Sequence, residues 1–443
     1  MEDNYGQIRV LHVLGGLGVG GAECRIMDLY RNMNRDRIQF DFLVHYSPDK
    51  TGKKSPTSDE LMAVREPDYF DNTVYSLGGR IFCLPKFVGT NLLDYKAAIR
   101  NFFKEHQNEW KVVQGHMTST AAIYLPIAKK AGIPICAAHA RSAGVDKGVK
   151  GIATNIFRTP LRKEGVTDFN FACSKEAGVA VFGNTLVEQG KVKIIPNAID
   201  LKNFAYNEEK RNRIRKELGV ANAIVIGHVG SFRYAKNHEF LIQVFFNIIK
   251  MLENDVENKY CMLHGMRIKL LMLGTGPLMD NVKNLADRLG IYDKCIFAGN
   301  KSNAADYYQA MDYFCFPSRY EGLPGSVVEA QAAGLQCLVS DSVTPEVNAT
   351  KLVTMMSINL DAGEWAKKIL DDLILDDTEV LDASIDGYEP LAEGDNSIGK
   401  CSVGDRAGTS EYILNELRDA GFDVKLQAKQ MAYFYERGHF NGR

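Results

Sequence analysis

At 443 residues the chain is longer than a single hydrophobic core normally grows, so we expect two domains of roughly 200 residues each. Hydrophobic residues make up 45% and charged residues 24%, a balance typical of a globular protein and not of a disordered one. The formal net charge is -2 and no long Lys/Arg run occurs, which excludes a dedicated nucleic-acid binder.

Cysteine usage and the N-terminal segment indicate where the protein works. The nine cysteines include no C-x-x-C pair, and scattered, odd-numbered thiols are typical of a reducing cytosol. The segment Met1–Gly16 lacks the basic and apolar regions of a secretory signal, and no apolar run reaches the ~18 residues that a membrane span needs. We therefore expect a cytoplasmic protein whose contact with the inner face of the cell membrane, if it makes one, is peripheral.

Short apolar runs alternate with helical patterns in the first half of the chain. We expect strands at Ile8–Leu14, Phe40–His45, Val112–Gly115, Pro134–Ala138, Phe169–Cys173 and Val192–Ile195. We expect helices at Glu23–Asn32, Ala121–Ala131 and Glu176–Phe182. This alternation predicts βαβ units around a parallel sheet.

A glycine-rich loop follows the first expected strand. Gly16, Gly18 and Gly21 satisfy the dinucleotide pattern G-x-G-x-x-G before a helix, where the backbone can approach a diphosphate closely. An NAD-dependent oxidoreductase would use such a loop, but it needs an acidic residue after the second strand, where Tyr46 and Ser47 stand. A flexible strand-to-helix turn without a ligand explains the glycines equally well. The loop alone therefore does not decide between such a turn and a diphosphate-binding site, including that of an oxidoreductase.

Two histidines stand at the ends of expected strands in the first half. His116 follows Val112–Gly115 and His139 follows Pro134–Ala138. Because the carboxyl ends of parallel strands form the ligand edge of such a sheet, either ring could hydrogen-bond a sugar. A structural role is equally compatible with these positions.

A turn-rich segment divides the chain. Pro196–Asp200 precedes the very polar stretch Asn203–Glu217, and we place the domain boundary there. The expected domains are 1–198 and 199–422, each Rossmann-like, followed by residues 423–443 with a final helix at Val424–Tyr435 that returns toward the first domain. Residues 49–68 and 382–410 are expected to be surface loops.

A second alternating series begins after the boundary. We expect strands at Ala223–Gly230, Ile268–Gly274, Cys295–Ala298, Tyr313–Pro317 and Leu335–Ser340. We expect helices at Glu239–Met251, Met279–Leu289, Ala304–Met311 and Val327–Ala333. The series predicts a second doubly wound α/β domain.

Two carboxylates flank a Gly/Pro turn in the segment Ser318–Ala330. Glu321 comes at the carboxyl end of a strand, Glu329 lies one turn into a helix, and the amides of Gly325–Val327 form that helix's N-terminus. Free amides suit pyrophosphate oxygens, and each carboxylate can accept from sugar hydroxyls. The segment favours a nucleotide-sugar site over the alternative of a capped surface helix.

Cations are needed where a nucleoside diphosphate departs. Arg233 and Lys236 lie in a strand-to-helix loop and are the candidates. No Asp-x-Asp triplet occurs in the chain, which argues against a diphosphate held through a carboxylate-bound metal ion. We therefore expect neither a metal nor another cofactor.

Over nearly its whole length the sequence resembles retaining glycosyltransferases of the GT-B fold, family 4, and in particular bacterial enzymes of capsular and extracellular polysaccharide synthesis. The resemblance rests on LGGLGVGGAECRIMDLYRN, QGHMTSTAAI, AAHARSAG, FACSKEAGVAVFG, KIIPNAIDLKNF, GHVGSFRYAKNHEFLI, LLMLGTGP and FPSRYEGLPGSVVEAQAAGLQCLVSDS. It implies two Rossmann-like domains that face a cleft. One departure concerns Ser231, which stands where the family usually has Arg, with Arg233 two positions later.

The resemblance also implies residue roles. Glu321, His139, Lys236 and Arg233 would be catalytic, and His116 and Arg141 would serve the acceptor side. The donor would be held by Gly20, Gly21, Gly230, Ser231, Gly274, Gly276, Gly322, Leu323, Pro324, Gly325, Ser326 and Glu329. Lys147–Lys163, with apolar and basic side chains, is expected either to lie on anionic lipid or to pack on its own domain.

The function expected from these features is retaining transfer of a hexose from a UDP-hexose to a saccharide or polyprenyl-linked acceptor. The departing phosphate would take the acceptor's proton, because no obvious nucleophile or strong base is at hand. Two alternatives with the same architecture stay open: a sugar-nucleotide 2-epimerase, which would act on the donor without an acceptor, and a non-catalytic partner subunit, suggested by Ser231.

Overall fold

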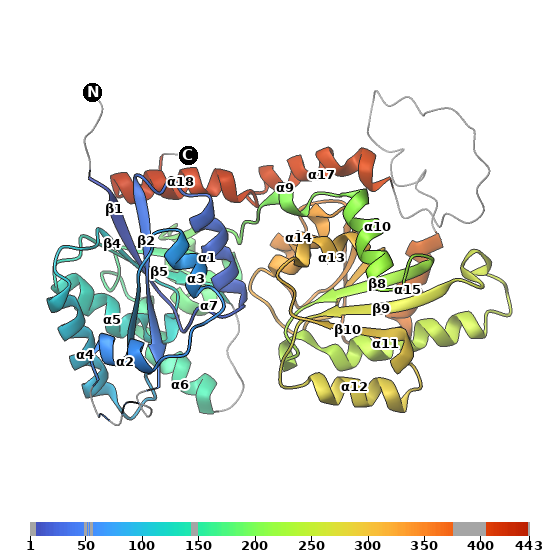
Figure 1. Ribbon diagram of the computed structural model, residues 1–443, viewed down its shortest axis with the longest axis horizontal. Helices are drawn as coiled ribbons and strands as arrows, with labels where there is room; N and C mark the ends of the chain where they lie inside the picture. The colour runs from blue at the N-terminus through green and yellow to red at the C-terminus, as the bar shows by residue number, and fades with distance from the viewer. Residues whose placement is uncertain are drawn as a thin grey trace. The chain divides into compact units, whose positions relative to one another are not determined.

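The computed structural model describes residues 6–47, 51, 53, 56–142, 149–374 and 405–441. The chain divides into two compact units (Figure 1). Unit 1 comprises Met1–Asp200 and Gly421–Arg443, and unit 2 comprises Leu201–Ala420. The last stretch of the sequence therefore belongs to the same unit as the first.

Unit 1 is built on a parallel sheet whose described strands run in the order β3-β2-β1-β4-β5-β6-β7. The strands are β1 (Ile8–Val13), β2 (Ile38–Tyr46), β3 (Ile81–Pro85), β4 (Val112–Gly115), β5 (Ile135–Ala140), β6 (Phe169–Ala172) and β7 (Val192–Ile194). The helices are α1 (Gly21–Arg31), α2 (Ser58–Val64), α3 (Asp71–Ser76), α4 (Leu92–Glu105), α5 (Thr118–Lys130), α6 (Val149–Arg158), α7 (Lys175–Phe182), α8 (Asn184–Glu188) and α18 (Val424–Arg437), with a 3-10 turn, η2, at Thr159–Arg162.

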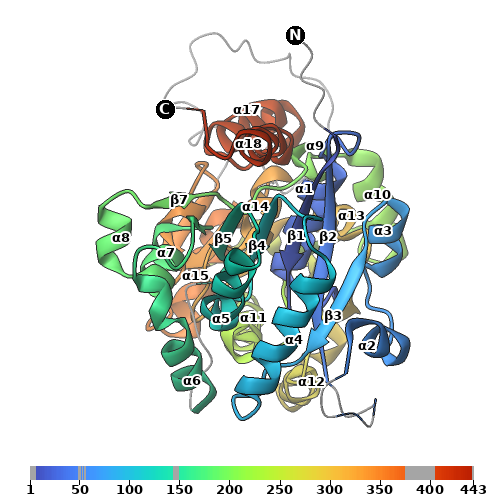
Figure 2. The same ribbon diagram turned by 90° about the vertical axis from the view of Figure 1, so that its left-hand side faces the viewer.

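The strands of unit 1 are apolar on both faces because helices cover both faces. In β2, the stretch Ile38–His45 is buried throughout. Helices α1 and α18 contribute to the cluster on one face through residues such as Ile26 and Phe434. Figure 2 shows α4 and α5 on the viewer's side of the sheet, where Ile99 and Leu125 are buried.

Unit 2 repeats this plan with a six-stranded parallel sheet in the described residues, in the order β10-β9-β8-β11-β12-β13. Its strands are β8 (Ala223–Val229), β9 (Arg267–Leu273), β10 (Cys295–Gly299), β11 (Tyr313–Phe316), β12 (Gln336–Ser340) and β13 (Val353–Met356). Its helices are α9 (Leu201–Phe204), α10 (Glu208–Glu217), α11 (His238–Glu253), α12 (Met279–Arg288), α13 (Ala304–Ala310), α14 (Gly325–Ala332), α15 (Ala362–Ile374) and α17 (Arg406–Asp419), with a 3-10 turn, η3, at Tyr234–Lys236. Both sheets have the predicted doubly wound α/β architecture.

Helix α18 is tied into unit 1 by main chain and side chains. The amide of Ile199 donates to Phe422 O over 2.9 Å, and the amide of Val424 donates to Ile199 O over 3.0 Å. Its apolar face, which includes Met431 and Phe434, lies in the unit 1 core together with residues of β1 and β2. Burial of this face, and not helix propensity alone, stabilises a helix of this length.

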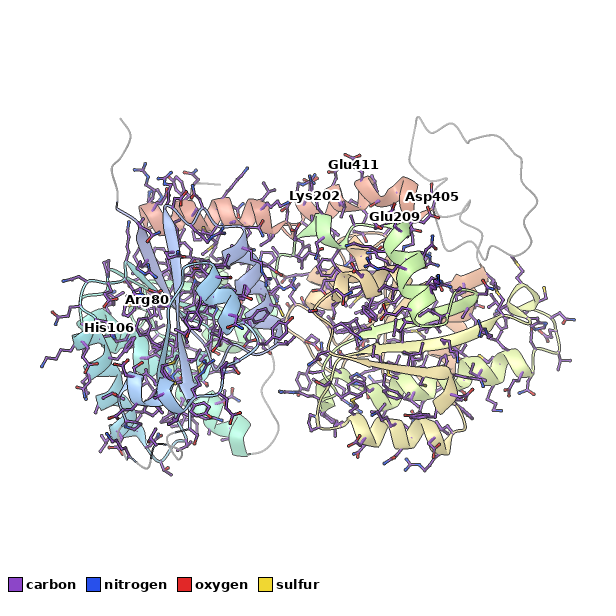
Figure 3. All side chains as sticks on the ribbon, in the orientation of Figure 1. Arg80, His106, Lys202, Glu209, Asp405 and Glu411 are labelled. Atoms are coloured by element: carbon purple, nitrogen blue, oxygen red, sulfur yellow. The ribbon has the colours of Figure 1, made fainter. Side chains whose placement is uncertain are left out.

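Two segments predicted as loops are partly helical, which corrects the sequence interpretation. Within 49–68, α2 begins after Thr57, whose side chain accepts from the Glu60 amide while the Glu60 carboxylate accepts from the Thr57 amide. This capping box is a sequence signal that composition concealed. Within 382–410, α17 begins at Arg406 after the cap Asp405, labelled in Figure 3. Residues 382–404 lie outside the described part of the chain.

Arg406 explains why α17 stays attached to unit 2. Its guanidinium donates to Ala333 O and Met311 O over 2.9 Å each, so it satisfies carbonyls at the end of α14 and before β11. Burial, together with the nearby Arg211, lowers the pKa of Arg406 to about 9. The segment 382–410 was predicted to be a surface loop because its composition is polar, and a buried arginine was therefore not expected there.

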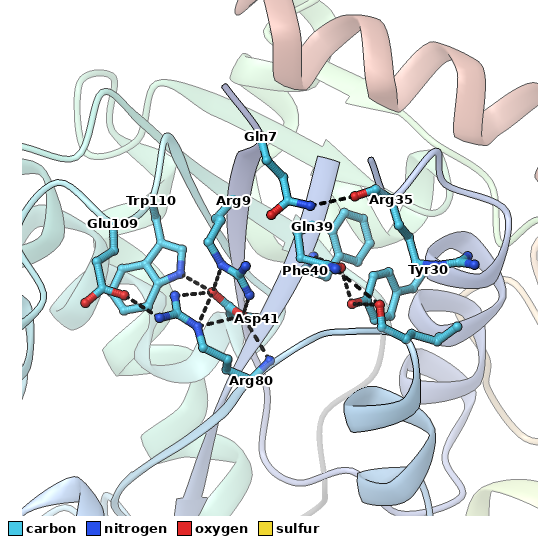
Figure 4. Close-up of polar contacts among 11 residues, drawn as sticks. Gln7, Arg9, Tyr30, Arg35, Gln39, Phe40, Asp41, Arg80, Glu109 and Trp110 are labelled. Carbon is cyan, nitrogen blue, oxygen red and sulfur yellow. Dashed lines mark hydrogen bonds and ion pairs between the residues drawn. The ribbon is translucent and has the colours of Figure 1, made fainter. Parts of the chain in front are cut away.

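A buried carboxylate joins β2 to its neighbours in unit 1. Asp41 is fully buried and accepts from Arg9 Nε and Trp110 Nε1 over 2.8 Å each and from Arg80 Nη2 over 2.7 Å (Figure 4). On the exposed side, Arg80 also pairs with Glu109 at 2.7 Å. A single acidic group thus joins β1 and β2 to the segments that precede β3 and β4.

The described residues contain no helix with both the length and the apolar character needed to cross a membrane. Within the same residues, no group of three or more His, Cys, Asp or Glu side chains is arranged to hold a metal ion.

Candidate functional site

The sheet of unit 2 places its binding loops at one point. β8 is the first strand of the unit along the chain, yet it lies between β9 and β11: the chain first adds β9 and β10 on one side of β8 and then returns to place β11 on its other side. Ligands of open α/β sheets bind where the strand order reverses in this way, outside the carboxyl ends of the strands. The loops that follow β8 and β11 contain Lys236 and Glu321.

Lys236 and Glu321 form an ion pair at this switch point. Lys236 Nζ lies 2.7 Å from Glu321 Oε1, and the two side chains are 17% and 18% exposed. The ammonium group also sits 4.6 Å from the centre of the Phe316 ring at the end of β11. The pair is therefore fixed by the ends of two neighbouring strands while it remains accessible to a ligand.

Glu329 is held in a different way. It lies in the second turn of α14, is 9% exposed, and its Oε2 accepts from the Tyr308 hydroxyl over 2.7 Å. Tyr308 comes from α13, which packs beside α14. The tyrosine orients the carboxylate, and sequence reasoning missed it because the contact spans 21 positions.

Helix α14 begins at Gly325, two residues before the predicted start. Its N-cap is Pro324, which fixes the entry of the chain and has no side-chain group to accept from the first amides. Such a helix N-terminus attracts anions through its amides and its dipole. It lies on the chain between the two acidic residues, as the sequence predicted.

Glycines allow the loops after β8 and β9 to pack backbone against backbone. A Cβ on Gly274, whose φ is +129°, would lie 2.1 Å from Gly230 O, and one on Gly276 would lie 2.6 Å from Phe232 O. The amide of Gly230 donates to Leu273 O and that of Phe232 to Thr275 O, over 3.0 Å each. These predicted donor-binding glycines hold the loop that ends at Lys236.

Ser231 and Arg233 are exposed at the start of the same loop. Among the described residues, no hydrogen bond or ion pair joins the Arg233 side chain to Glu321 or Glu329. Arg319, which the sequence analysis did not select, donates to Tyr234 O over 2.7 Å and its guanidinium lies 4.2 Å from the centre of the Tyr234 ring. The structure thus brings Lys236, and not Arg233, to the carboxylate.

Unit 1 has its own cluster at the carboxyl ends of β1, β4 and β5. His12 Nδ1 lies 3.0 Å from His116 Nε2, and Arg141 Nε donates to His116 Nδ1 over 3.4 Å. Arg141 Nη1 donates to Asn197 Oδ1 over 2.9 Å. The predicted residues His116 and Arg141 are therefore in contact, and His12, which was not selected from the sequence, joins them from β1.

A hydrogen-bond chain fixes the protonation of His139. Tyr435 of α18 donates to Gln114 Oε1 over 2.7 Å, and Gln114 Nε2 donates to His139 Nδ1 over 3.0 Å. With Nδ1 accepting, the ring proton lies on Nε2. Among the described residues, this buried Nε2 has no hydrogen-bond partner. His139 therefore presents an N–H donor.

The histidines of this cluster are held neutral. Burial, followed by the charge of Arg141, lowers the pKa of His12 to about 3 and lowers the pKa values of His116 and His139 well below their usual range. Burial also lowers the pKa of Arg141 itself, to about 10. At neutral pH the cluster therefore holds one cation and three neutral rings.

The glycine loop of unit 1 begins helix α1. Gly20 is the N-cap of α1, and a Cβ there would lie 2.2 Å from Glu23 Oε2. The loop is anchored by Asp68, whose Oδ2 accepts from the Leu17 amide over 2.8 Å. Gly20 and Gly21 therefore sit at the N-terminus of α1, beside the Glu23 carboxylate.

Solved structures share the whole architecture. The Anabaena protein HepE in complex with UDP-glucose matches with a TM-score of 0.65, covering 98% of this chain and 100% of that chain at 14% sequence identity. The similarity assigns the fold of unit 1 and unit 2 to the GT-B glycosyltransferase class. It confirms the fold class that the sequence predicted.

Sequence comparisons give the family. A family model described as glycosyl transferases group 1 matches residues 223–374. The putative glycosyltransferase EpsF of Bacillus subtilis is 31% identical over 371 residues, 83% of this chain and 88% of that protein. The chain belongs to the group 1 glycosyltransferases, and this decides against the oxidoreductase that the glycine loop had left open.

Two further relatives have more specific names. The capsular polysaccharide biosynthesis glycosyltransferase CapH of Staphylococcus aureus is 24% identical over 82% of this chain and 90% of that protein. The UDP-Gal:alpha-D-GlcNAc-diphosphoundecaprenol alpha-1,3-galactosyltransferase of Escherichia coli is 25% identical over 62% of this chain and 68% of that protein.

Proposed function

We propose that the protein transfers a hexose from a UDP-hexose, with retention, to a polyprenyl-diphosphate-linked saccharide in bacterial surface polysaccharide synthesis. The names of CapH and the Escherichia coli galactosyltransferase support the pathway and the acceptor class, and HepE binds UDP-glucose in the same fold. The observation that carries the proposal is the Lys236–Glu321 pair at the switch point of unit 2, beside an N-terminus of α14 that has no side-chain cap.

In this proposal unit 2 holds the donor. The amides of Gly325 and Ser326 and the Lys236 ammonium bind the diphosphate, and Glu329 accepts from the ribose hydroxyls. Glu321 accepts from hydroxyls of the hexose while it positions Lys236. The remaining donor contacts come from the backbone of Gly20, Gly21, Gly230, Ser231, Gly274, Gly276, Gly322, Leu323 and Pro324.

The reaction needs no metal ion in this scheme. The bond between the anomeric carbon and the diphosphate breaks, the acceptor oxygen bonds to that carbon on the same face, and the departing phosphate takes the acceptor's proton. Lys236 and the α14 dipole stabilise the charge that grows on the phosphate, and Arg233 adds an exposed cation near the loop. His139 donates from Nε2 to a sugar oxygen, with His116 and Arg141 on the acceptor side.

A panel of nucleotide-sugars tests the donor class. UDP-hexoses should raise the melting temperature in the presence of EDTA, because a ligand at 100 times its Kd stabilises the native state by about 2.7 kcal/mol. GDP- and ADP-hexoses at the same concentration should not. Stabilisation that disappears with EDTA would overturn the metal-free scheme. Isomerisation of the donor without any acceptor would instead favour the sugar-nucleotide 2-epimerase.

We also propose that α6 contacts an anionic membrane from unit 1. Ile152 and Ile156 are each 63% exposed on this helix, and Arg162 is exposed on the following turn. Leu161 is fully buried and Arg158 is 6% exposed, so these two side chains pack on their own domain, which is the other alternative for this segment. Lys147 lies outside the described residues.

Vesicle flotation tests this contact. The double variant Ile152→Ser/Ile156→Ser should float markedly less with phosphatidylglycerol vesicles than the wild type, because two exposed apolar side chains no longer enter the interface. Tyr75→Ser, which removes an apolar side chain that is 51% exposed on α3, should float like the wild type. Equal flotation of all three proteins would remove α6 from the membrane contact.

A further inference from the structure

A buried arginine without a counter-ion lies at the end of α6. The side chain of Arg158 is 6% exposed, and its Nε is buried with no hydrogen-bond partner. Across the described ranges of the chain, no carboxylate pairs with it. A guanidinium N–H that is withdrawn from water without an acceptor costs roughly 1–3 kcal/mol. Residues that destabilise the free protein in this way are typical of binding sites.

A second cation increases this cost. Arg162 lies one turn further on, in η2, and its Nη2 donates to Ala180 O over 3.4 Å. Burial first, and then the charge of Arg162, lowers the pKa of Arg158. The two guanidinium groups therefore repel each other, and within the described residues no acidic side chain forms an ion pair with either. An anion placed between them would remove both penalties.

The surface is hollowed at this point. Arg158 and Arg162 line a hollow of about 610 Å³, together with Asn155, Thr159 and Asn184. The hollow has the size of small-molecule sites and is lined by hydrogen-bonding side chains and two guanidinium forks. It is distinct from the loops of Lys236 and Glu321, which belong to unit 2.

We propose that this hollow binds a phosphate-bearing group, which Arg158 and Arg162 hold by their guanidinium forks. Two cations match the charge of a phosphate dianion or a diphosphate, whereas a single carboxylate would neutralise only one of them. The identity of this group rests on the proposed function. The phosphate comes from the diphosphate of the lipid-linked acceptor, because Ile152 and Ile156 are exposed on the same helix. A soluble phosphate compound would present the same chemistry, and the vesicle experiment described below distinguishes it from the lipid-linked diphosphate.

Thermal melting of the full chain tests the site. Saturating UDP is present throughout, so that pyrophosphate does not act through the donor loops. Inorganic pyrophosphate should then raise the melting temperature of the wild type beyond the effect of sodium chloride at equal ionic strength. Arg158→Met should bind pyrophosphate at least about tenfold more weakly, because a charge-assisted contact of roughly 1.5–3 kcal/mol is lost.

The melting temperature of Arg158→Met without pyrophosphate distinguishes a binding role of Arg158 from a purely structural one. Without pyrophosphate, Arg158→Met should melt at or above the wild-type temperature, because methionine removes an unpaired buried charge. Arg100→Met makes the same charge change at an exposed position of α4 and should keep the full pyrophosphate response. If Arg158→Met melts below the wild type, the exposed Arg162→Met decides instead: pyrophosphate binding weakened at least about tenfold supports the site, and a full pyrophosphate response overturns it.

Vesicles separate the two sources. Stronger flotation of the wild type, but not of Arg158→Met, with phosphatidylcholine vesicles doped with a polyprenyl diphosphate supports the lipid source. A pyrophosphate response without such flotation supports a soluble phosphate compound. A wild type that pyrophosphate does not stabilise, or an Arg158→Met variant that responds fully, overturns the site. Failure of UDP itself to stabilise the protein would instead count against the proposed function.

Discussion

Glu321→Gln should lower kcat by roughly 10- to 150-fold, the equivalent of ~1.5–3 kcal/mol for a charge-assisted hydrogen bond. Glutamine keeps the volume of the side chain, but it removes both the charge that faces Lys236 at 2.7 Å and the anionic acceptor for donor hydroxyls. Because both side chains are partly exposed, we expect little change in the free energy of unfolding. The measurement is the rate of UDP release with donor and acceptor present.

Glu253→Gln is the matched control for this variant. Glu253 also pairs with a lysine, Lys250, at 2.6 Å, but that pair lies on the surface of α11 with side chains about half exposed. Its loss should leave kcat unchanged. A Glu321→Gln enzyme that turns over at the wild-type rate would remove Glu321 from the reaction, and equal losses in both variants would show that any lost ion pair suffices.

Asp41→Asn should lower the free energy of unfolding of unit 1 by about 2–4 kcal/mol. The carboxylate is fully buried and accepts from Arg9, Arg80 and Trp110, so asparagine leaves Arg9 without this counter-charge and leaves Arg80 with Glu109 alone. Breaking a fully buried pair costs about 3–5 kcal/mol, and we expect less because Arg80 is 41% exposed. For a domain of this size the melting temperature should fall by roughly 4–16 °C.

The pH dependence of this effect follows from the pKa of Asp41. Burial by itself would raise that pKa, but hydrogen bonds from Arg9, Arg80 and Trp110 outweigh burial and lower it. A carboxyl whose pKa is lower in the folded state stabilises the protein above its unfolded pKa of about 3.9, and this stabilisation is lost as the pH falls through the folded pKa. The advantage of the wild type over Asp41→Asn should therefore shrink below about pH 4.

The control for Asp41→Asn is Glu164→Gln. Glu164 also belongs to unit 1 and pairs with Lys191 at the surface, where the two side chains are 64% and 45% exposed, so its loss should change stability by less than about 0.5 kcal/mol. Denaturant unfolding that reports on unit 1 checks both variants. Equal stability of the two would contradict the role of the Asp41 cluster.

The sequence predicted the parts of the site that are local in the chain. Alternating apolar runs located both sheets, and Glu321 and Glu329 were selected because a strand end, a turn and a helix start follow one another within thirteen residues, Ser318–Ala330. The tyrosines that orient side chains of the two clusters were not predicted. Tyr308 donates to Glu329 from another helix, and Tyr435 donates to Gln114 from α18; no periodicity in the sequence encodes such contacts.

Arg158 shows a second limit of sequence reasoning. A basic residue in an amphipathic helix is normally solvated, and for this segment the sequence left open whether it lies on lipid or packs on its own domain. The helical period does not reveal which neighbours cover the other faces of a helix. In the fold the Arg158 side chain is buried with an unpartnered Nε, and Leu161 is fully buried while Ile152 stays exposed. Only the packing distinguishes the two orientations.

The return of α18 to unit 1 sets the order in which the protein can mature. During synthesis, residues 1–200 leave the ribosome well before the segment that completes their hydrophobic core. Before Tyr435 has been translated, no tyrosine hydroxyl donates to Gln114 Oε1. The Gln114 amide is then not oriented, and the ring proton of His139 is not confined to Nε2. A nascent chain can therefore finish unit 2 first, and the ring proton of His139 is fixed only after residue 435 has been translated.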